Sequence, residues 1–239
     1  SFYSLIALGY CLVYGVLLLI NFAHGDIFMV GAYIAFYCCM FLLGKFGVFA
    51  GLPGWMVLAV AIPLTMILTA VVGVTLERIA YRPLRRKGVN RLYVVITALM
   101  CGLILENGNL ALLGASRKSF PTLVPIKVFD IFGVTVTNIK LMVIGVAILS
   151  FLLLHFIVTR TKIGMAMRAI SYDRFAVPLM GIPADTVIVF TFVLGSGFAG
   201  LAGLFFAMTY PVIDPYMGAL IGWKAFIAAV VGGIGSIAG

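Results

Sequence analysis

The sequence contains very little charge. Only 10% of its 239 residues are Asp, Glu, Lys or Arg, whereas 64% are hydrophobic. Soluble domains contain about 25% charged and about 45–50% apolar residues. No soluble fold of this length could hide so much apolar surface, so most of the chain is expected to lie in lipid.

Motifs for nucleotide binding and for catalysis are also missing. There is no G-x-x-x-x-G-K-[ST] motif for the phosphates of ATP and no nucleophile elbow. His24 and His155 are far apart and share no metal spacing. All four cysteines lie inside apolar runs, without a C-x-x-C pattern: Cys11, Cys38, Cys39 and Cys101. We expect buried free thiols, no metal site, and no enzymatic activity in this chain.

One glycine-rich segment imitates a dinucleotide-binding motif. Gly195–Gly200, GSGFAG, fits G-x-G-x-x-G, but that motif requires a preceding strand and a helix that opens at the glycines. Here the glycines lie midway along an apolar run. They are predicted to allow close packing between helices.

Six apolar runs approach the roughly 20 residues that a spanning helix requires. They are Phe2–Ile20, Ile27–Leu43, Trp55–Leu76, Leu92–Leu113, Ile139–Val158 and Thr186–Met208, and a shorter Gly-rich run covers Ala219–Ala238. We predict an all-α polytopic integral membrane protein with about six to eight transmembrane helices. Because the chain begins at Ser1 and ends in an apolar run, we expect it to be part of a longer protein.

The net charge of +9 is concentrated in loops, which indicates membrane orientation and argues against nucleic-acid binding. Glu77–Arg91 contains six Lys or Arg residues and Arg160–Asp185 contains four. Positive loops stay in the cytoplasm, so both are placed there. Gly114–Asn138 would then face the opposite side, where the alternating stretch Val134–Thr137 predicts a short strand or hairpin.

The second basic loop contains a stretch, IGMAMRAISYDRFAVPLMG, that can form one short amphipathic helix. One stripe at helical spacing consists of Ile163, Met167, Ile170 and Arg174. Such a helix either lies flat on the lipid headgroups or docks into a groove on a partner. Periodicity leaves both interpretations open.

Polar side chains within the apolar runs are the candidate site residues. Asn21, His24 and Asp26 lie in INFAHGDIF, and Glu106 lies towards the outer end of its run. They either line a path or satisfy an interrupted backbone, with Asp26 as a helix N-cap or first-turn residue. Asn21–Asp26 is a tight cytoplasmic turn if both flanking runs cross fully. It lies within the membrane if they form one discontinuous element.

Four long segments, in order along the chain, resemble the LivH-type permease subunit of branched-chain amino acid ABC importers. They are SLIALGYCLVYGVLLLINFAHGDIFMVGAYIAF, ERIAYRPLR, RTKIGMAMRAISYDRFAVPLMGI and DPYMGALIGWKAFIAAVVGGIGSIAG. The resemblance implies one transmembrane permease domain over residues 1–239, in the bacterial inner membrane, with loop 114–138 in the periplasm. Members of the family continue beyond this C-terminus, so further helices are expected.

The resemblance also implies partners. These are a second, homologous permease subunit in a heterodimer, two cytoplasmic ATPase subunits that bind Mg-ATP, and a periplasmic substrate-binding protein. No cofactor is implied for this chain itself.

By position, the resemblance makes about Gly164–Gly181 a coupling helix that docks on an ATPase. The contact surface expected from the sequence consists of Met167, Arg168, Ala169, Asp173 and Arg174. Arg168 and Arg174 would pair with ATPase carboxylates. In the alternative, these charges are merely solvated, because exposed ion pairs contribute little.

Other functions stay open at this level. Related permeases of the same architecture suggest urea or short amides as substrates. A secondary transporter or channel would work without ATPases, but the few carboxylates in the apolar runs offer little for ion coupling. A membrane enzyme is disfavoured because no catalytic constellation occurs.

Overall fold

The computed structural model describes residues 2–43, 53–131, 134–173 and 176–235, and every structural statement below concerns these residues. The helices are α1 (Phe2–Leu17), α2 (His24–Leu43), α3 (Gly54–Leu76), the π-helix η1 (Glu77–Tyr81), α4 (Arg82–Arg86), α5 (Arg91–Leu113), α6 (Asn138–Arg160), α7 (Lys162–Tyr172), α8 (Ala176–Leu179), α9 (Ala184–Thr209) and α10 (Met217–Val231). Short strands are β1 (Lys118–Ser119), β2 (Val128–Ile131), β3 (Val134–Thr137) and β4 (Val212–Ile213).

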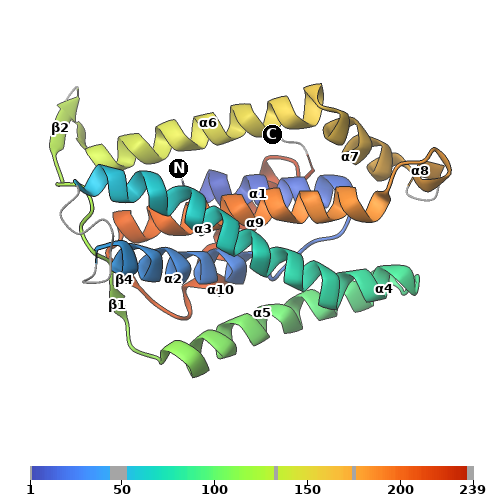
Figure 1. The fold of residues 1–239 in the computed structure, drawn as a ribbon, viewed down its shortest axis with the longest axis horizontal. Helices are drawn as coiled ribbons and strands as arrows, with labels where there is room; N and C mark the ends of the chain where they lie inside the picture. The colour runs from blue at the N-terminus through green and yellow to red at the C-terminus, as the bar shows by residue number, and fades with distance from the viewer. Residues whose placement is uncertain (1, 44–52, 132–133, 174–175, 236–239) are drawn as a thin grey trace.

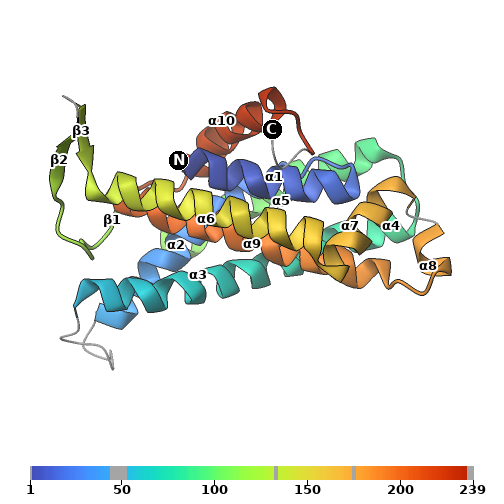
Figure 2. The ribbon, with the colours of Figure 1, turned by 90° about the horizontal axis from the view of Figure 1, so that it is seen from above.

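The predicted all-α membrane fold is confirmed. Five helical stretches are long and apolar enough to cross a membrane, and α1 and α10 are shorter apolar helices. The long helices α3, α6 and α9 run along one common direction (Figure 1). At one end lie the β-strands, and we call this the strand end. At the other lie α4, α7 and α8 (Figures 1 and 2), and we call this the basic end.

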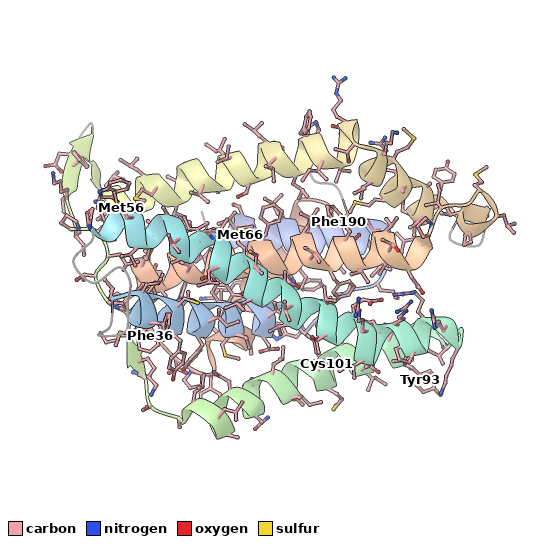
Figure 3. All side chains as sticks on the ribbon, viewed as in Figure 1. Phe36, Met56, Met66, Tyr93, Cys101 and Phe190 are labelled. Atoms are coloured by element: carbon pink, nitrogen blue, oxygen red, sulfur yellow. The ribbon has the colours of Figure 1, made fainter. Side chains whose placement is uncertain are left out.

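Helix α9 forms the centre of the bundle and packs against α1, α2 and α3. Its glycines face those helices closely. A Cβ atom at Gly200 would lie 2.5 Å from Oγ1 of Thr69, and one at Gly203 would lie 2.6 Å from the backbone nitrogen of Ala32. Gly197 faces Met66, which Figure 3 labels on α3. The prediction that GSGFAG serves helix packing is therefore confirmed.

The strand end contains two small antiparallel pairs. Strands β2 and β3 form a hairpin in which Val128 pairs with Thr137, which confirms the hairpin predicted from the alternating pattern. Strand β1 pairs with β4, with Lys118 opposite Ile213. The sequence pattern did not predict this second pair, because its partners are two residues long and far apart in the chain.

The first two apolar runs are shorter or shifted relative to the prediction. Helix α1 ends at Leu17 and not at Ile20, because Leu18 adopts a left-handed conformation with φ of 53°. Helix α2 begins at His24 and not at Ile27. The intervening segment runs back along the bundle, so that α2 starts near its middle (Figure 1).

The first basic loop is largely helical. After α3, the chain continues through η1 and α4, and Gly54–Arg86 forms one uninterrupted helical stretch of 33 residues. Pro83 lies at the start of α4, directly after the π-helical turn. The four cysteines are buried and free, as predicted.

Candidate functional site

The polar residues between α1 and α2 lie halfway along the bundle. His24 contacts Gly9 near the middle of α1, and Asp26 contacts Gly102 near the middle of α5. Gly9 in turn faces Gly195 near the middle of α9. His24 and Asp26 therefore lie inside the helical bundle, the position expected for the discontinuous arrangement.

Asn21 holds the interrupted backbone together. Its Oδ1 accepts a 2.6 Å hydrogen bond from the Tyr81 hydroxyl, and its backbone carbonyl accepts one from the His24 amide at 3.1 Å. Both Asn21 and Tyr81 are buried. The contact connects the α1–α2 turn to η1 at the basic end of the bundle.

Asp26 lies in the first turn of α2, as expected, with a side chain only 8% exposed. Its carboxylate is held between two glycines. Oδ2 faces Gly102 of α5, and a Cβ atom at Gly218 of α10 would lie 2.7 Å from Oδ1. Among the described residues, Oδ1 of Asp26 has no hydrogen-bond partner. The carboxylate is therefore buried, sterically enclosed and only partly satisfied.

A cavity of about 350 Å³ opens beside this carboxylate, between α2, α5 and α10. Small-molecule sites usually measure about 300–1,000 Å³. Its lining combines two acids, several glycines and a large apolar surface: Tyr10, Phe22, Gly25, Asp26, Leu99, Met100, Gly102, Leu103, Glu106, Gly218, Ala219, Gly222, Trp223 and Phe226.

Glu106 reaches the same cavity from α5 and is half-buried. The structure thus brings together two of the four predicted site residues, Asp26 and Glu106, although 80 positions separate them in the sequence. Asn21 and His24 are buried nearby but do not line the cavity. No pattern in the sequence indicated which of the four residues would meet.

Aromatic rings form one wall of the cavity. Phe22 lies 5.5 Å, centroid to centroid, from both Trp223 and Phe226, and Tyr10 lies 5.7 Å from Phe226. The ring of Tyr10 also meets that of His24 at 4.7 Å. These contacts fix the α1–α2 turn against α10. They also place aromatic rings in the same cavity lining as the two carboxylates.

The sequence did not predict a cluster of charges that the structure shows at the basic end. Asp185, in the first turn of α9, accepts hydrogen bonds from three arginines: Arg82, Arg85 and Arg86. Arg85 also donates to Oε1 of Glu77 at 2.8 Å, and the Glu77 side chain is fully buried. The two basic loops are therefore tied to each other through Asp185. The signal available in the sequence was one acid at the end of one basic loop and one at the start of the other.

Helix α7 is amphipathic, as predicted, and begins where the Thr161 hydroxyl accepts a hydrogen bond from the Gly164 amide. Its buried face includes Met167, whose side chain is 1% exposed and belongs to the core of this chain. Arg168 is exposed and donates a 2.6 Å hydrogen bond to the Val158 carbonyl. Ala169 is half-buried.

The rest of the expected contact surface follows α7. Asp173 is exposed, its carboxylate accepts a hydrogen bond from the Ala176 amide, and Arg174 lies outside the described residues. The predicted single helix ends at Tyr172, and the short helix α8 follows it. Large apolar side chains are exposed at the end of α7 and at the end of α8: Tyr172, Leu179 and Met180.

Within the part of the chain that the structure describes, no three His, Cys, Asp or Glu side chains are grouped so that they could hold a metal ion. The candidate site thus consists of carboxylates, aromatic rings and apolar side chains. Such a lining can contact a cationic group and an apolar group of one small molecule.

Comparison with known proteins gives a match along the entire chain. Residues 1–239 match the family described as "Branched-chain amino acid transport system / permease component". The high-affinity branched-chain amino acid transport system permease protein BraD of Pseudomonas aeruginosa is 40% identical over 243 residues. LivH of Escherichia coli K12, which carries the same description, is 35% identical. Each alignment covers 100% of this chain and 77% of the relative. No solved structure matches the chain.

Proposed function

Since this chain belongs to the family of branched-chain amino acid transport permease components, we propose that it carries leucine, isoleucine or valine across the bacterial inner membrane. In this proposal it is the transmembrane subunit of an ATP-binding-cassette importer. A periplasmic binding protein delivers the substrate, and two cytoplasmic ATPase subunits bind and hydrolyse ATP. The basic end faces the cytoplasm, in accordance with the positive-inside rule.

The observation that carries this proposal is the cavity beside Asp26. It lies halfway along helices that are otherwise apolar, and its volume of about 350 Å³ suits a small amino acid. Polar groups at membrane depth are costly unless they serve a pathway or a partner. Its apolar lining suits an aliphatic side chain better than urea or a short amide.

We further propose that a second, homologous permease covers the open side of the cavity. Leu99, Met100 and Leu103 of α5 and Trp223 of α10 line it, yet they are exposed in this single chain. A cavity that holds a charged substrate beside two carboxylates needs shielding from lipid, because charges in hydrocarbon are costly. A heterodimer with α5 and α10 at its interface would provide that cover.

Uptake by the complete importer in proteoliposomes tests the function. With the binding protein outside and ATP inside, we expect radiolabelled leucine to accumulate, and labelled urea to stay at the level of empty liposomes. A non-hydrolysable ATP analogue is the control and should abolish accumulation. Leucine uptake that persists with the analogue would contradict the proposal of an ATP-driven importer. Accumulation of urea would contradict the proposed selectivity for branched-chain amino acids.

The turn from α7 to α8 is the proposed ATPase contact. Arg168, Ala169 and Asp173 remain in this surface, and the exposed side chains of Tyr172 and Met180 extend it. Met167 supports it from the inside, because its side chain is buried. The guanidinium of Arg168 keeps free donors beyond its bond to Val158, so it can still pair with an ATPase carboxylate.

Replacing Arg168 with glutamate should weaken co-purification of the ATPase subunits and lower leucine uptake in proportion. Lys127→Glu is the matched control, because Lys127 is an exposed cation at the strand end. The Lys127→Glu variant should retain both co-purification of the ATPase subunits and leucine uptake. Undiminished binding and transport in Arg168→Glu would remove Arg168 from the contact.

A further inference from the structure

The acidic cavity offers a specific partner for one part of the transported molecule. We propose that Asp26 and Glu106 bind the α-ammonium group of the amino acid inside the membrane, while the apolar wall of the same cavity holds its side chain. This inference rests on the proposed function, and it assigns a binding site that the family match does not specify.

The buried state of Asp26 is the first argument. Its side chain is 8% exposed, it lines the cavity, and its Oδ1 has no hydrogen-bond partner among the described residues. A buried carboxylate is costly unless a donor or a cation meets it. The start of α2 offers this carboxylate only a partial positive charge, so a charged donor that enters the cavity would complete its partners.

The position of the ion pairs is the second argument. In the described part of the chain, every salt bridge lies at one of the two ends: around Asp185 and Glu77 at the basic end, and between Arg117 and Asp214 at the strand end. None of them includes Asp26 or Glu106. The two acids of the cavity are therefore both available to a cation.

The shape around Asp26 is the third argument. Gly102 and Gly218 leave the room that its carboxylate occupies, since a Cβ atom at either position would press on a carboxylate oxygen. Both glycines also line the cavity. The small residues thus leave room for the carboxylate at the cavity wall.

The remaining lining suits an amino acid better than a bare cation. Tyr10, Phe22 and Trp223 present aromatic rings, which attract ammonium groups through their faces. Leu103 and Phe226 offer apolar surface for an aliphatic side chain. A metal ion would find two carboxylates here, and no group of three metal-ligating side chains occurs among the described residues.

Direct binding to the wild-type importer, in detergent and without the binding protein, tests the chemistry. Bound labelled leucine is challenged separately with two competitors. Isoamylamine lacks the carboxylate of leucine, and 4-methylvalerate lacks its ammonium group. We expect isoamylamine to compete and 4-methylvalerate to fail at the same concentration. The reverse order would overturn the proposal, and this arm does not depend on the folding of any variant.

Variants then assign the residues. Asp26→Asn and Glu106→Gln should each weaken leucine binding about tenfold to hundredfold, the loss expected for a charge-assisted hydrogen bond. Asn107→Ala is the matched control. Asn107 lies next to Glu106 on α5 but is exposed, bonds to the Leu103 carbonyl and does not line the cavity. This control should bind leucine like wild type.

The two proposals fail in different ways. If the wild-type importer does not accumulate leucine, the proposed function fails. If it does, but both acid variants bind leucine within about twofold of wild type, the ammonium site fails and the function stands. Should Asp26→Asn be unstable, the outcome for Glu106→Gln and the competition on wild type still decide the matter.

Discussion

Replacing Arg85 with methionine should destabilise the protein strongly, because it leaves Glu77 as an unpaired charge in the interior. The Glu77 side chain is 0% exposed, Arg85 donates to its Oε1 at 2.8 Å, and its Oε2 has no partner among the described residues. Breaking a buried ion pair from one side costs about 3–5 kcal/mol. At about 2–4 °C per kcal/mol, the melting temperature should fall by about 6–20 °C.

Thermal unfolding of the purified importer in detergent measures this loss. Arg86→Met is the matched control, since Arg86 also bonds Asp185 but its side chain is 64% exposed. Exposed pairs contribute about 0–1 kcal/mol, so this variant should melt close to wild type. The double variant Glu77→Gln, Arg85→Met should recover most of the loss, because no buried charge remains. Equal losses for Arg85→Met and Arg86→Met, or no recovery in the double variant, would refute the reasoning.

Two further predictions concern packing and the α1–α2 turn. Gly203→Ala should lower the melting temperature, because a Cβ atom there would lie 2.6 Å from the backbone of α2. Gly145→Ala, with nothing within 4 Å, should leave it unchanged or raise it. Tyr81→Phe should cost about 1–3 kcal/mol by depriving Asn21 of its 2.6 Å hydrogen bond, whereas Tyr93→Phe on the exposed face of α5 should cost nothing measurable. A stable Gly203→Ala, or equal melting of the two tyrosine variants, would contradict these expectations.

The sequence predicted the long helices well, because a membrane helix is encoded by the length of its apolar run. Predicted and observed ends of α5, α6 and α9 differ by at most two residues. The break between α1 and α2 was harder to locate. Leu18 adopts its left-handed backbone within an apolar stretch, so no Gly or Pro marked the end of α1.

The pairing of Glu77 with Arg85 shows a second limit. At about 100° per residue, eight positions along an α-helix rotate the side chain by about 800°, which places it about 80° away from the start. The wider π-helical turn of Glu77–Tyr81 takes up one extra residue, which reduces that offset to about 20°. Ordinary helical spacing therefore leaves the two charges about 80° apart, and the π-helical turn brings them closer into line.

The polar residues of INFAHGDIF were open to two interpretations from the sequence, as backbone support or as a pathway lining. The contacts indicate that the two roles belong to different residues of this stretch. Asn21 accepts hydrogen bonds from the Tyr81 hydroxyl and the His24 amide, so its two oxygens support the turn, while its Nδ2 has no partner among the described residues. Asp26 also has an unbonded atom, Oδ1, but unlike Asn21 it lines the cavity.

One feature of the backbone explains why both roles occur within six residues. A helix that starts inside a membrane has amide groups without intrahelical partners, and they need nearby polar atoms. Its N-terminus also carries a partial positive charge, which favours a carboxylate in the first turn. Asp26 occupies that turn in α2, halfway along the bundle. The interruption that Asn21 stabilises is therefore also what makes a carboxylate tolerable beside the cavity.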